Sequence, residues 1–208
     1  MLHTETVKPH NFSLLKELMQ LEALKDFQLV GGTALSLQLG HRISDDIDLF
    51  TNSAFVNEEL IDSLNNYFTG RFELKSRVEN KLGIFCLIDG VKVDICRHKQ
   101  ELIDTISETD GIRMWSLKDL AASKVNAISS RATKKDFWDI DRLLDIYNVT
   151  EIAAFYRKKY LPMLVIGVAQ MITYYADAEK SNAPVCLLNK TWEGVKKSIF
   201  KKINNHTK

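Results

Sequence analysis

The apolar positions of residues 1–115 switch between two spacings, the three-to-four-residue spacing of helices and the tighter patterns of strands. Helical spacing predicts helices over 11–24, 34–39 and 57–68. Short apolar or alternating runs predict strands over 27–30, 46–51, 72–78, 82–88 and 91–97. This part of the chain is therefore expected to hold four or five strands and two or three helices.

Capping residues and glycines mark the ends of these elements. Asn11 or Ser13 suits the N-cap of the first helix, and Gly40 is placed to end the second. The pair Gly31-Gly32, directly after an apolar run, predicts a tight turn. Asp89-Gly90 between two predicted strands is a strong signal for a two-residue hairpin.

After Met114 only helical spacing continues. It predicts helices over 116–128, 134–147, 151–160, 163–175 and 190–203. The whole pattern therefore predicts an α+β fold, with a mixed α/β lobe over 1–115 and a helical lobe over 116–208.

Composition narrows the class of protein. The length of 208 residues suits one domain or two small lobes that share an interface. The three cysteines show no metal-ligand spacing, which indicates reduced thiols in a cytosolic protein. No signal peptide is visible, and the most apolar run, 161–172, is far shorter than the ~20 residues of a membrane-spanning helix. We therefore expect a cytoplasmic protein that is not associated with a membrane.

Charge is unevenly distributed along the chain. The net charge of +1 does not by itself indicate nucleic-acid binding, but residues 189–208 hold six lysines against the single acid Glu193. Such a tail can follow a phosphate backbone. It can equally be the solvated end of a helix, where lysines are favoured by the helix dipole. The sequence leaves both interpretations open.

Three acids flanked by apolar residues form the chemically informative pattern. Alternation on a strand puts Asp46 and Asp48 on one face, about 7 Å apart at Cα. Asp94 joins them if the strand 91–97 lies beside the strand 46–51. Clustered carboxylates raise each other's pKa unless a cation lies between them, and oxygen ligands favour Mg²⁺. The pattern predicts a metal site at these three aspartates, against the plainer interpretation of acids on a solvated strand face.

Two metal ions and a glycine turn would complete a site for phosphate chemistry. Two Mg²⁺ ions about 3.5–4 Å apart can hold the attacking and leaving oxygens of a phosphoryl transfer. Gly31 and Gly32 let the backbone approach a phosphate, and the following helix N-terminus offers free N–H groups. Thr33 can add a hydroxyl or cap that helix. The turn alone would indicate no more than a turn, but together with the acids it predicts a site that grips a nucleoside triphosphate.

Two stretches resemble a known family. The stretch GGTALSLQLGHRISDDIDLF, residues 31–50, closely resembles the signature of the AbiEii-type nucleotidyltransferase toxins, within the DNA-polymerase-β-like superfamily. A second stretch, from LAASK at 120–124 through Arg131 to KDFWD at 135–139, resembles the family's lysine, arginine and basic-Asp-x-x-Asp run on consecutive helices. The resemblance covers roughly residues 25–145.

The resemblance implies a polymerase-β-like fold and a magnesium-dependent nucleotidyltransferase. Such an enzyme moves a nucleotide from a nucleoside triphosphate to an acceptor, often tRNA, as the toxin of a toxin–antitoxin or phage-defence system with an antitoxin protein as partner. By matched position, Asp46 and Asp48 bind metal, Asp94 completes the site and takes the acceptor hydroxyl's proton, and Lys124 contacts the triphosphate. The other residues expected to contact the nucleotide are Gly31, Gly32, Thr33, Arg42, Arg131, Lys135 and Asp136.

Several of these residues also have structural interpretations. Lys124 can lie along an apolar surface with its ammonium group in water. Lys135 can pair with Asp139 one helical turn later, and Asp136 can be an ordinary surface acid. Arg42 can meet a phosphate, pair with a neighbouring aspartate, or hold its loop shut.

Two other functions stay open at this point. A protein of the same fold without catalysis would act as a binding or regulatory module, but the intact acids, glycines and Lys124 argue against it. A transferase with a small-molecule or protein acceptor is the other alternative. A large acidic cleft would be expected for a small aminoglycoside-type acceptor, and the lysine-rich tail points weakly the other way. The sequence does not specify which base is transferred.

Overall fold

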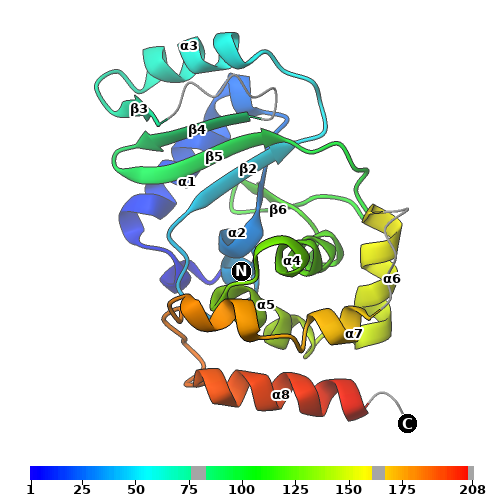
Figure 1. Cartoon of the computed structure of the whole chain (residues 1–208). Helices are drawn as coiled ribbons and strands as arrows, with labels where there is room; N and C mark the ends of the chain where they lie inside the picture. Colours follow the sequence, from blue (N-terminus) through cyan, green and yellow to red (C-terminus); the bar gives the residue numbers. More distant parts are fainter. Residues whose placement is uncertain (76–82, 161–166, 206–208) are drawn as a thin grey trace.

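A mixed β-sheet forms the centre of the molecule in the computed structural model, which describes residues 1–75, 83–160 and 167–205 (Figure 1). Its seven strands follow the order β3-β4-β5-β2-β1-β7-β6. The strands are β1 (Gln28–Val30), β2 (Ile47–Thr51), β3 (Phe72–Leu74), β4 (Gly83–Ile88), β5 (Val91–Arg97), β6 (Ser107–Thr109) and β7 (Ile112–Met114). The predicted α+β class is confirmed.

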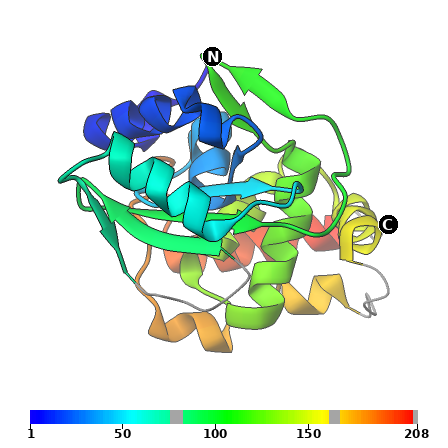
Figure 2. The ribbon, with the colours of Figure 1, turned by 90° about the horizontal axis from the view of Figure 1, so that it is seen from above.

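The helices pack around this sheet. They are α1 (Pro9–Gln20), α2 (Gly31–Leu39), α3 (Asn57–Tyr67), α4 (Leu117–Arg131), α5 (Lys134–Leu143), α6 (Val149–Tyr160), α7 (Val168–Met171) and α8 (Trp192–Asn205). Short 3-10 helices are η1 (Thr4–Thr6), η2 (Glu22–Leu24) and η3 (Ala176–Lys180). Figure 2 shows α1 and α3 on the same side of the sheet, and α4 lies on the other side (Figure 1).

The central strand β2 pairs with β1 in antiparallel orientation and with β5 in parallel orientation. The register of the parallel pair sets Asp48 directly opposite Asp94. Ile47 and Leu49 alternate with the acid, and each is 1% exposed. The predicted placement of the strand 91–97 beside the strand 46–51 is therefore confirmed.

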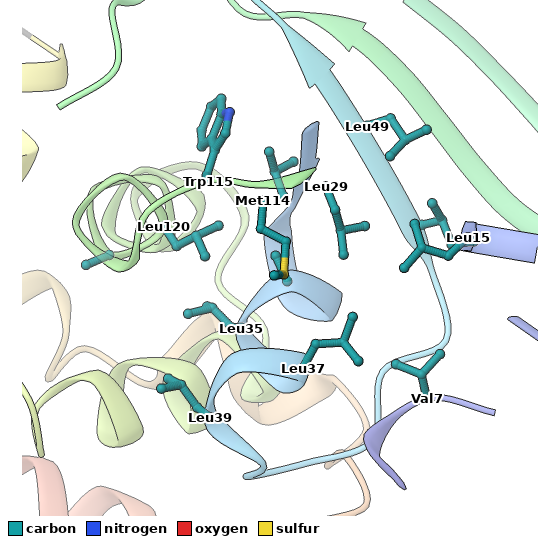
Figure 3. Close-up of a cluster of buried hydrophobic side chains, with 14 of the residues drawn as sticks. Val7, Leu15, Leu29, Leu35, Leu37, Leu39, Leu49, Met114, Trp115 and Leu120 are labelled. Atoms are coloured by element: carbon teal, nitrogen blue, oxygen red, sulfur yellow. The ribbon is translucent and has the colours of Figure 1, made fainter. Parts of the chain in front are cut away.

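Apolar side chains pack on both faces of the sheet and form the core. Figure 3 shows Leu15 of α1 next to Leu49 of β2, on the face turned away from α4. On the opposite side, Leu35 of α2 lies near Leu120 of α4, and both are at most 1% exposed. Burying a leucine side chain of this kind contributes roughly 1.5–3 kcal/mol. The core thereby fixes α4 against α2, on the side of the sheet where the acids lie.

The helices after β7 are anchored by caps and by aromatic packing. Ser116, the N-cap of α4, accepts a hydrogen bond from the backbone N–H of Asp119 at 3.1 Å, as its position before a helical pattern predicts. The ring of Trp192 at the start of α8 stacks on Trp138 of α5, with centroids 5.6 Å apart. Three of the tail lysines form ion pairs with acids of this chain, which supports the structural interpretation for Lys190, Lys196 and Lys202.

A segment before α8 crosses back to the first part of the chain. We name residues 181–190 the C-terminal strap. The backbone N–H of Ile43 donates to the carbonyl of Val185 at 2.9 Å, and the N–H of Leu187 donates to the carbonyl of His41 at 3.0 Å. These bonds form an isolated antiparallel bridge between Arg42 and Cys186. The strap therefore fixes the loop that precedes the acids of β2.

Two helix starts differ from the prediction. The first helix begins at Pro9 with Lys8 as N-cap, instead of Asn11 or Ser13, because proline at the first helical position presets the backbone for a helix. The second helix begins at Gly31 rather than after Thr33. Its end is as predicted, since Gly40 closes it with a φ of 66°.

The strand count was underestimated because a second hairpin was missed. β6 and β7 flank the turn Asp110-Gly111, and both turn residues have positive φ, as at Asp89-Gly90. β7 then pairs with β1 in parallel orientation. The same Asp-Gly signal that predicted the first hairpin was present here.

The boundaries of other helices and strands differ from the predicted ones by a few residues. α5 ends at Leu143, short of the predicted 147. The predicted strand 72–78 is seen up to Leu74, and residues 76–78 lie outside the described residues. Residues 163–166 of the predicted helix 163–175 also lie outside them, and α7 covers Val168–Met171.

All seven strands precede Trp115 and helices α4 to α8 follow it, but one continuous apolar core spans the boundary. The division into lobes at residue 115 therefore stays a prediction. In the parts of the chain that the structure describes, no helix has both the length and the apolar character needed to cross a membrane.

Candidate active site

A cleft of about 520 Å³ lies between the sheet and α4. β2 and β5 supply one wall, α4 supplies the other, and the start of α2 closes one end. Nine of the eleven residues predicted for the site line this cleft: Gly31, Gly32, Arg42, Asp46, Asp48, Asp94, Lys124, Arg131 and Lys135. The two that do not are Thr33 and Asp136.

The paired acids Asp48 and Asp94 occupy the wall formed by the sheet. Burial raises the pKa of Asp48, and the neighbouring charges of Asp94 and Asp46 raise it further. Asp94 accepts a hydrogen bond from Lys92 Nζ at 2.7 Å through Oδ2. Its other oxygen, Oδ1, is buried and has no hydrogen-bond partner among the described residues. A buried carboxylate oxygen without a partner, beside a second carboxylate, is an arrangement that a bound cation relieves.

These acids fit an open magnesium site rather than a closed metal cage. Among the described residues, no group of three His, Cys, Asp or Glu side chains is gathered closely enough to enclose a metal ion. Mg²⁺ does not require such a cage, because it usually keeps several waters and takes one or two carboxylates together with substrate phosphates. Asp48 and Asp94 provide that pair, and Asp46 lies at the edge of the cleft with a side chain that is 41% exposed.

The glycine turn approaches these acids closely. Gly31 has a φ of +68°, and a Cβ added there would lie 2.6 Å from Oδ2 of Asp48. A Cβ added at Gly32 would overlap a guanidinium nitrogen of Arg42. Both positions therefore require glycine, because a side chain would displace an acid or a base of the cleft.

Thr33 supports the loop behind the cleft. Its hydroxyl lies 2.9 Å from the hydroxyl oxygen of Ser44 and donates to the backbone carbonyl of Asp46. The residue is 1% exposed. The structure therefore places Thr33 where it orients Asp46, and does not bring it to the predicted nucleotide contact.

A buried network of ion pairs lies under the basic side of the cleft, with Asp139 at its centre. Arg42 donates to Asp139 through Nε at 2.6 Å and Nη2 at 2.9 Å, and Lys124 Nζ lies 2.7 Å from Asp139 Oδ2. His41 Nε2 is 2.7 Å from Oδ1 of the same carboxylate. One aspartate thus holds the loop before β2 and the middle of α4 together.

Opposite charges outweigh burial in this network. Burial alone would raise the pKa of Asp139, but Arg42 and Lys124 hold the pKa well below its usual range. Burial would likewise lower the pKa of Lys124, but Asp139 and Asp136 raise it. Lys124 is therefore a fixed positive charge that faces the cleft, and it does not have its ammonium group in open water.

Asp136 holds Lys124 from the other side. Lys124 Nζ donates to Asp136 Oδ1 at 3.0 Å, and Thr133 donates to Asp136 Oδ2 through both its N–H and its hydroxyl. The second contact is the capping box of α5. Because Asp136 is fully buried and does not line the cleft, it is not the surface acid that the sequence suggested, and its contact with a nucleotide stays a prediction.

The mouth of the cleft carries two further basic residues. Lys135 Nζ lies 3.6 Å from Asp46 Oδ2, so Lys135 pairs with Asp46 rather than with Asp139. Arg131 ends α4 and lines the cleft. Their positions bring the stretch at 120–139 beside the acids of the stretch at 31–50.

Sequence reasoning missed residues that this geometry makes prominent. Lys92 lies two positions before Asp94 on the same strand, so alternation alone would have placed it beside the acid. The sequence suggests Asp139 as the last acid of the family's basic-Asp-x-x-Asp run, as a surface acid or as a partner of Lys135, and it gives His41 no role in the site. No local signal identifies Asp139 as the centre of the network, because its partners come from other elements.

Comparisons with known proteins agree with this geometry. A family model described as the nucleotidyl transferase AbiEii toxin of type IV toxin–antitoxin systems matches residues 13–161. An uncharacterised protein of Aquifex aeolicus strain VF5 is 28% identical to this chain, over 96% of this chain and 97% of that protein.

Two solved structures share the fold. MenT4, a nucleotidyltransferase toxin from Mycobacterium tuberculosis H37Rv, has a TM-score of 0.59 at 14% identity, covering 96% of this chain and 86% of its own. ANT(2″)-Ia in complex with adenylyl-2″-tobramycin has a TM-score of 0.51 at 12% identity, covering 71% of this chain and 91% of its own. At these identities the likeness shows the fold alone.

Proposed function

Because this chain belongs to the AbiEii family of nucleotidyl transferase toxins, we propose that it moves a nucleotide from a nucleoside triphosphate to an RNA acceptor, such as tRNA, with Mg²⁺ as cofactor. The observation that carries the proposal is the register of Asp48 opposite Asp94, next to the turn at Gly31. In keeping with the family, the protein would act as the toxin of a pair whose other member is an antitoxin protein.

The reaction follows from the groups around the cleft. The oxygen of an acceptor hydroxyl attacks the α-phosphorus of the triphosphate, the bond to the β-phosphate oxygen breaks, and pyrophosphate leaves. The hydroxyl proton passes to the carboxylate of Asp94. Lys124, held by two buried aspartates, faces the phosphates and offsets the negative charge that develops on them. Gly31 and Gly32 let the backbone of the α2 N-terminus approach the phosphates, and Arg42 adds a positive charge beside them.

Asp48 and Asp94 would hold Mg²⁺, and Asp46 at the edge of the cleft would be the further ligand for a second ion. When bound, the ions would supply positive charge that stabilises the transferring phosphate. Without metal, Lys92 and Lys135 supply the counter-charges to Asp94 and Asp46.

The charge at the mouth of the cleft favours a nucleic-acid acceptor. Arg131 and Lys135 line the cleft beside the acids, and their positive charges would attract a phosphate backbone. They would repel a polycationic small molecule of the kind seen adenylylated in the ANT(2″)-Ia structure. Transfer to a small molecule or to a protein, and binding without transfer, are the alternative outcomes of the test.

The test is a labelling experiment with a matched control. The purified protein is incubated with total RNA and each of four α-labelled triphosphates, with and without Mg²⁺. We expect label on RNA only with Mg²⁺, none with Asp46→Ala or Asp48→Ala, and wild-type labelling with Asp45→Ala, because Asp45 does not line the cleft and pairs with Lys8. Label that persists in both variants would reject the assignment, and triphosphate binding without transfer would favour a binding or regulatory protein.

A further inference from the structure

The cleft has two chemically different ends. One end carries the charged residues described above. Along the same strand face beyond Asp94 the lining becomes neutral, and six residues form this neutral end: Phe50, Cys96, His98, Leu120, Ser123 and Tyr160. Alternation on β2 and β5 puts Phe50 and Cys96 on the same face as the two acids.

Tyr160 and His98 of the neutral end are uncharged at neutral pH. Burial raises the pKa of Tyr160, whose hydroxyl lies 3.0 Å from that of Ser123. Burial and the charge of Lys159 lower the pKa of His98 to about 4. An anionic phosphate would therefore find no charged partner among the six residues.

His98 is held in place by packing, while one of its ring nitrogens, Nε2, has no hydrogen-bond partner among the described residues. Its ring stacks on Phe50 with centroids 6.1 Å apart and meets the edge of Trp115 at 4.7 Å. The residue is 9% exposed, and Nε2 is buried without a hydrogen-bond partner in the described residues. Lys159, which pairs with Asp119 at 2.6 Å and lies 3.9 Å from the Trp115 ring, fixes the layer behind it. A buried polar side chain without a partner calls for an explanation beyond folding.

A nucleobase matches the chemistry of this end. A base is a planar, uncharged ring that stacks on aromatic side chains and presents donors and acceptors at its edge. A neutral imidazole offers one donor and one acceptor. The charged end selects the triphosphate, and one nucleotide can span both ends because they belong to a single cleft.

We propose that the neutral end binds the nucleobase of the incoming nucleoside triphosphate and that His98 determines which base is accepted. This inference rests on the proposed function. A base of the acceptor RNA would compete for the same surface, and the experiment distinguishes the two occupants.

The experiment measures binding in the absence of any acceptor. Affinities for inorganic tripolyphosphate and for each of the four nucleoside triphosphates are measured by calorimetry with Mg²⁺, for the wild type, His98→Phe and His98→Gln. Phenylalanine keeps the ring but removes both nitrogens, and glutamine keeps a donor and an acceptor. His10→Phe is the matched control, because His10 is exposed on α1.

We expect the wild type to bind one or more triphosphates more tightly than tripolyphosphate. His98→Phe should reduce the preference among the four bases by about fivefold or more, the size of one lost hydrogen bond. Its affinity for tripolyphosphate should stay within about twofold of the wild type. His98→Gln should retain part of the preference, and His10→Phe all of it.

Two results would overturn the inference alone. One is a set of base preferences that His98→Phe leaves unchanged while tripolyphosphate still binds. The other is unchanged triphosphate binding by His98→Phe in calorimetry together with a fall in its transfer to RNA in the labelling experiment above, which would place the acceptor at the neutral end. If the wild type binds neither tripolyphosphate nor any nucleoside triphosphate, the proposed function fails and the inference fails with it.

Discussion

The ammonium nitrogen of Lys124 lies 2.7 Å from a carboxylate oxygen of Asp139, although Lys124 also lines the cleft. The lysine that would meet the triphosphate is therefore oriented before any substrate binds. A group fixed in this way contributes to transition-state stabilisation without a reorganisation step.

Replacing Asp139 is expected to destabilise the fold strongly. Asp139→Asn leaves Arg42 and Lys124 buried with too little opposing charge, and losing one partner of a buried ion pair costs about 3–5 kcal/mol. Denaturant unfolding measures the difference. Asp45→Asn is the control, since its pair with Lys8 is exposed and should change stability by no more than about 0.5 kcal/mol. A loss below about 1 kcal/mol for Asp139→Asn would contradict this account.

Replacing Asp48 is expected to stabilise the metal-free protein while it abolishes activity. The pKa of Asp48 is raised above its ordinary value of 3.8, so its ionisation at neutral pH opposes folding. The unfolding free energy of Asp48→Asn should therefore exceed that of the wild type by roughly 0.5–2 kcal/mol at pH 7. Because the carboxyl is protonated in both the folded and the unfolded state at low pH, the gain should shrink as the pH falls toward 4. Unfolding curves at several pH values test the sign.

The same variant tests metal binding without an activity assay. Mg²⁺ at ten times its dissociation constant should stabilise the wild type by about 1.4 kcal/mol, since it binds only the folded state. The same Mg²⁺ concentration should stabilise Asp48→Asn much less. Equal stabilisation of both proteins by Mg²⁺ would place the ion elsewhere.

Gly31→Ala and Gly70→Ala separate backbone strain from crowding of the acid. Both glycines have positive φ, but an added Cβ meets Asp48 at Gly31 and meets nothing within 4 Å at Gly70. Gly70→Ala should cost about 1–2 kcal/mol from the left-handed conformation alone. Gly31→Ala should cost about 1–3 kcal/mol more and should reduce labelling of RNA. Similar losses in the two variants would show that Asp48 yields easily to the methyl group.

The wild-type protein is expected to lose more stability in acid than the variant His98→Phe. Its pKa falls from 6.5 to about 4 on folding, so between these values the unfolded state binds the proton and the folded state does not. Lowering the pH from 7 to 5 should therefore cost the wild type about 2 kcal/mol more than His98→Phe. The measurement is unfolding free energy against pH. The exposed-site variant His10→Phe should follow the wild type, and parallel curves for all three proteins would refute the prediction.

The acids of the sheet were predictable because the physical rule that places them is local. Apolar residues on both sides of Asp48 and Asp94 need burial, so alternation turns both carboxylates to the opposite face. The pairing of Arg42 with Asp139 was not predictable in the same way. The two residues belong to distant segments, and tertiary packing, including that of α2 against α5, brings them together. The missed hairpin at Asp110-Gly111 is a different failure, because its strands are only three residues long and carry little pattern.

The C-terminal strap has a consequence for how the protein is made. Val185 and Leu187 pair with the loop at 41–43, so a segment far along the chain holds Arg42 in place. During synthesis the aspartates of β2 and the glycine turn are made before the strap. The loop that carries Arg42 therefore lacks these hydrogen bonds in the growing chain until the strap has been made and has folded against it.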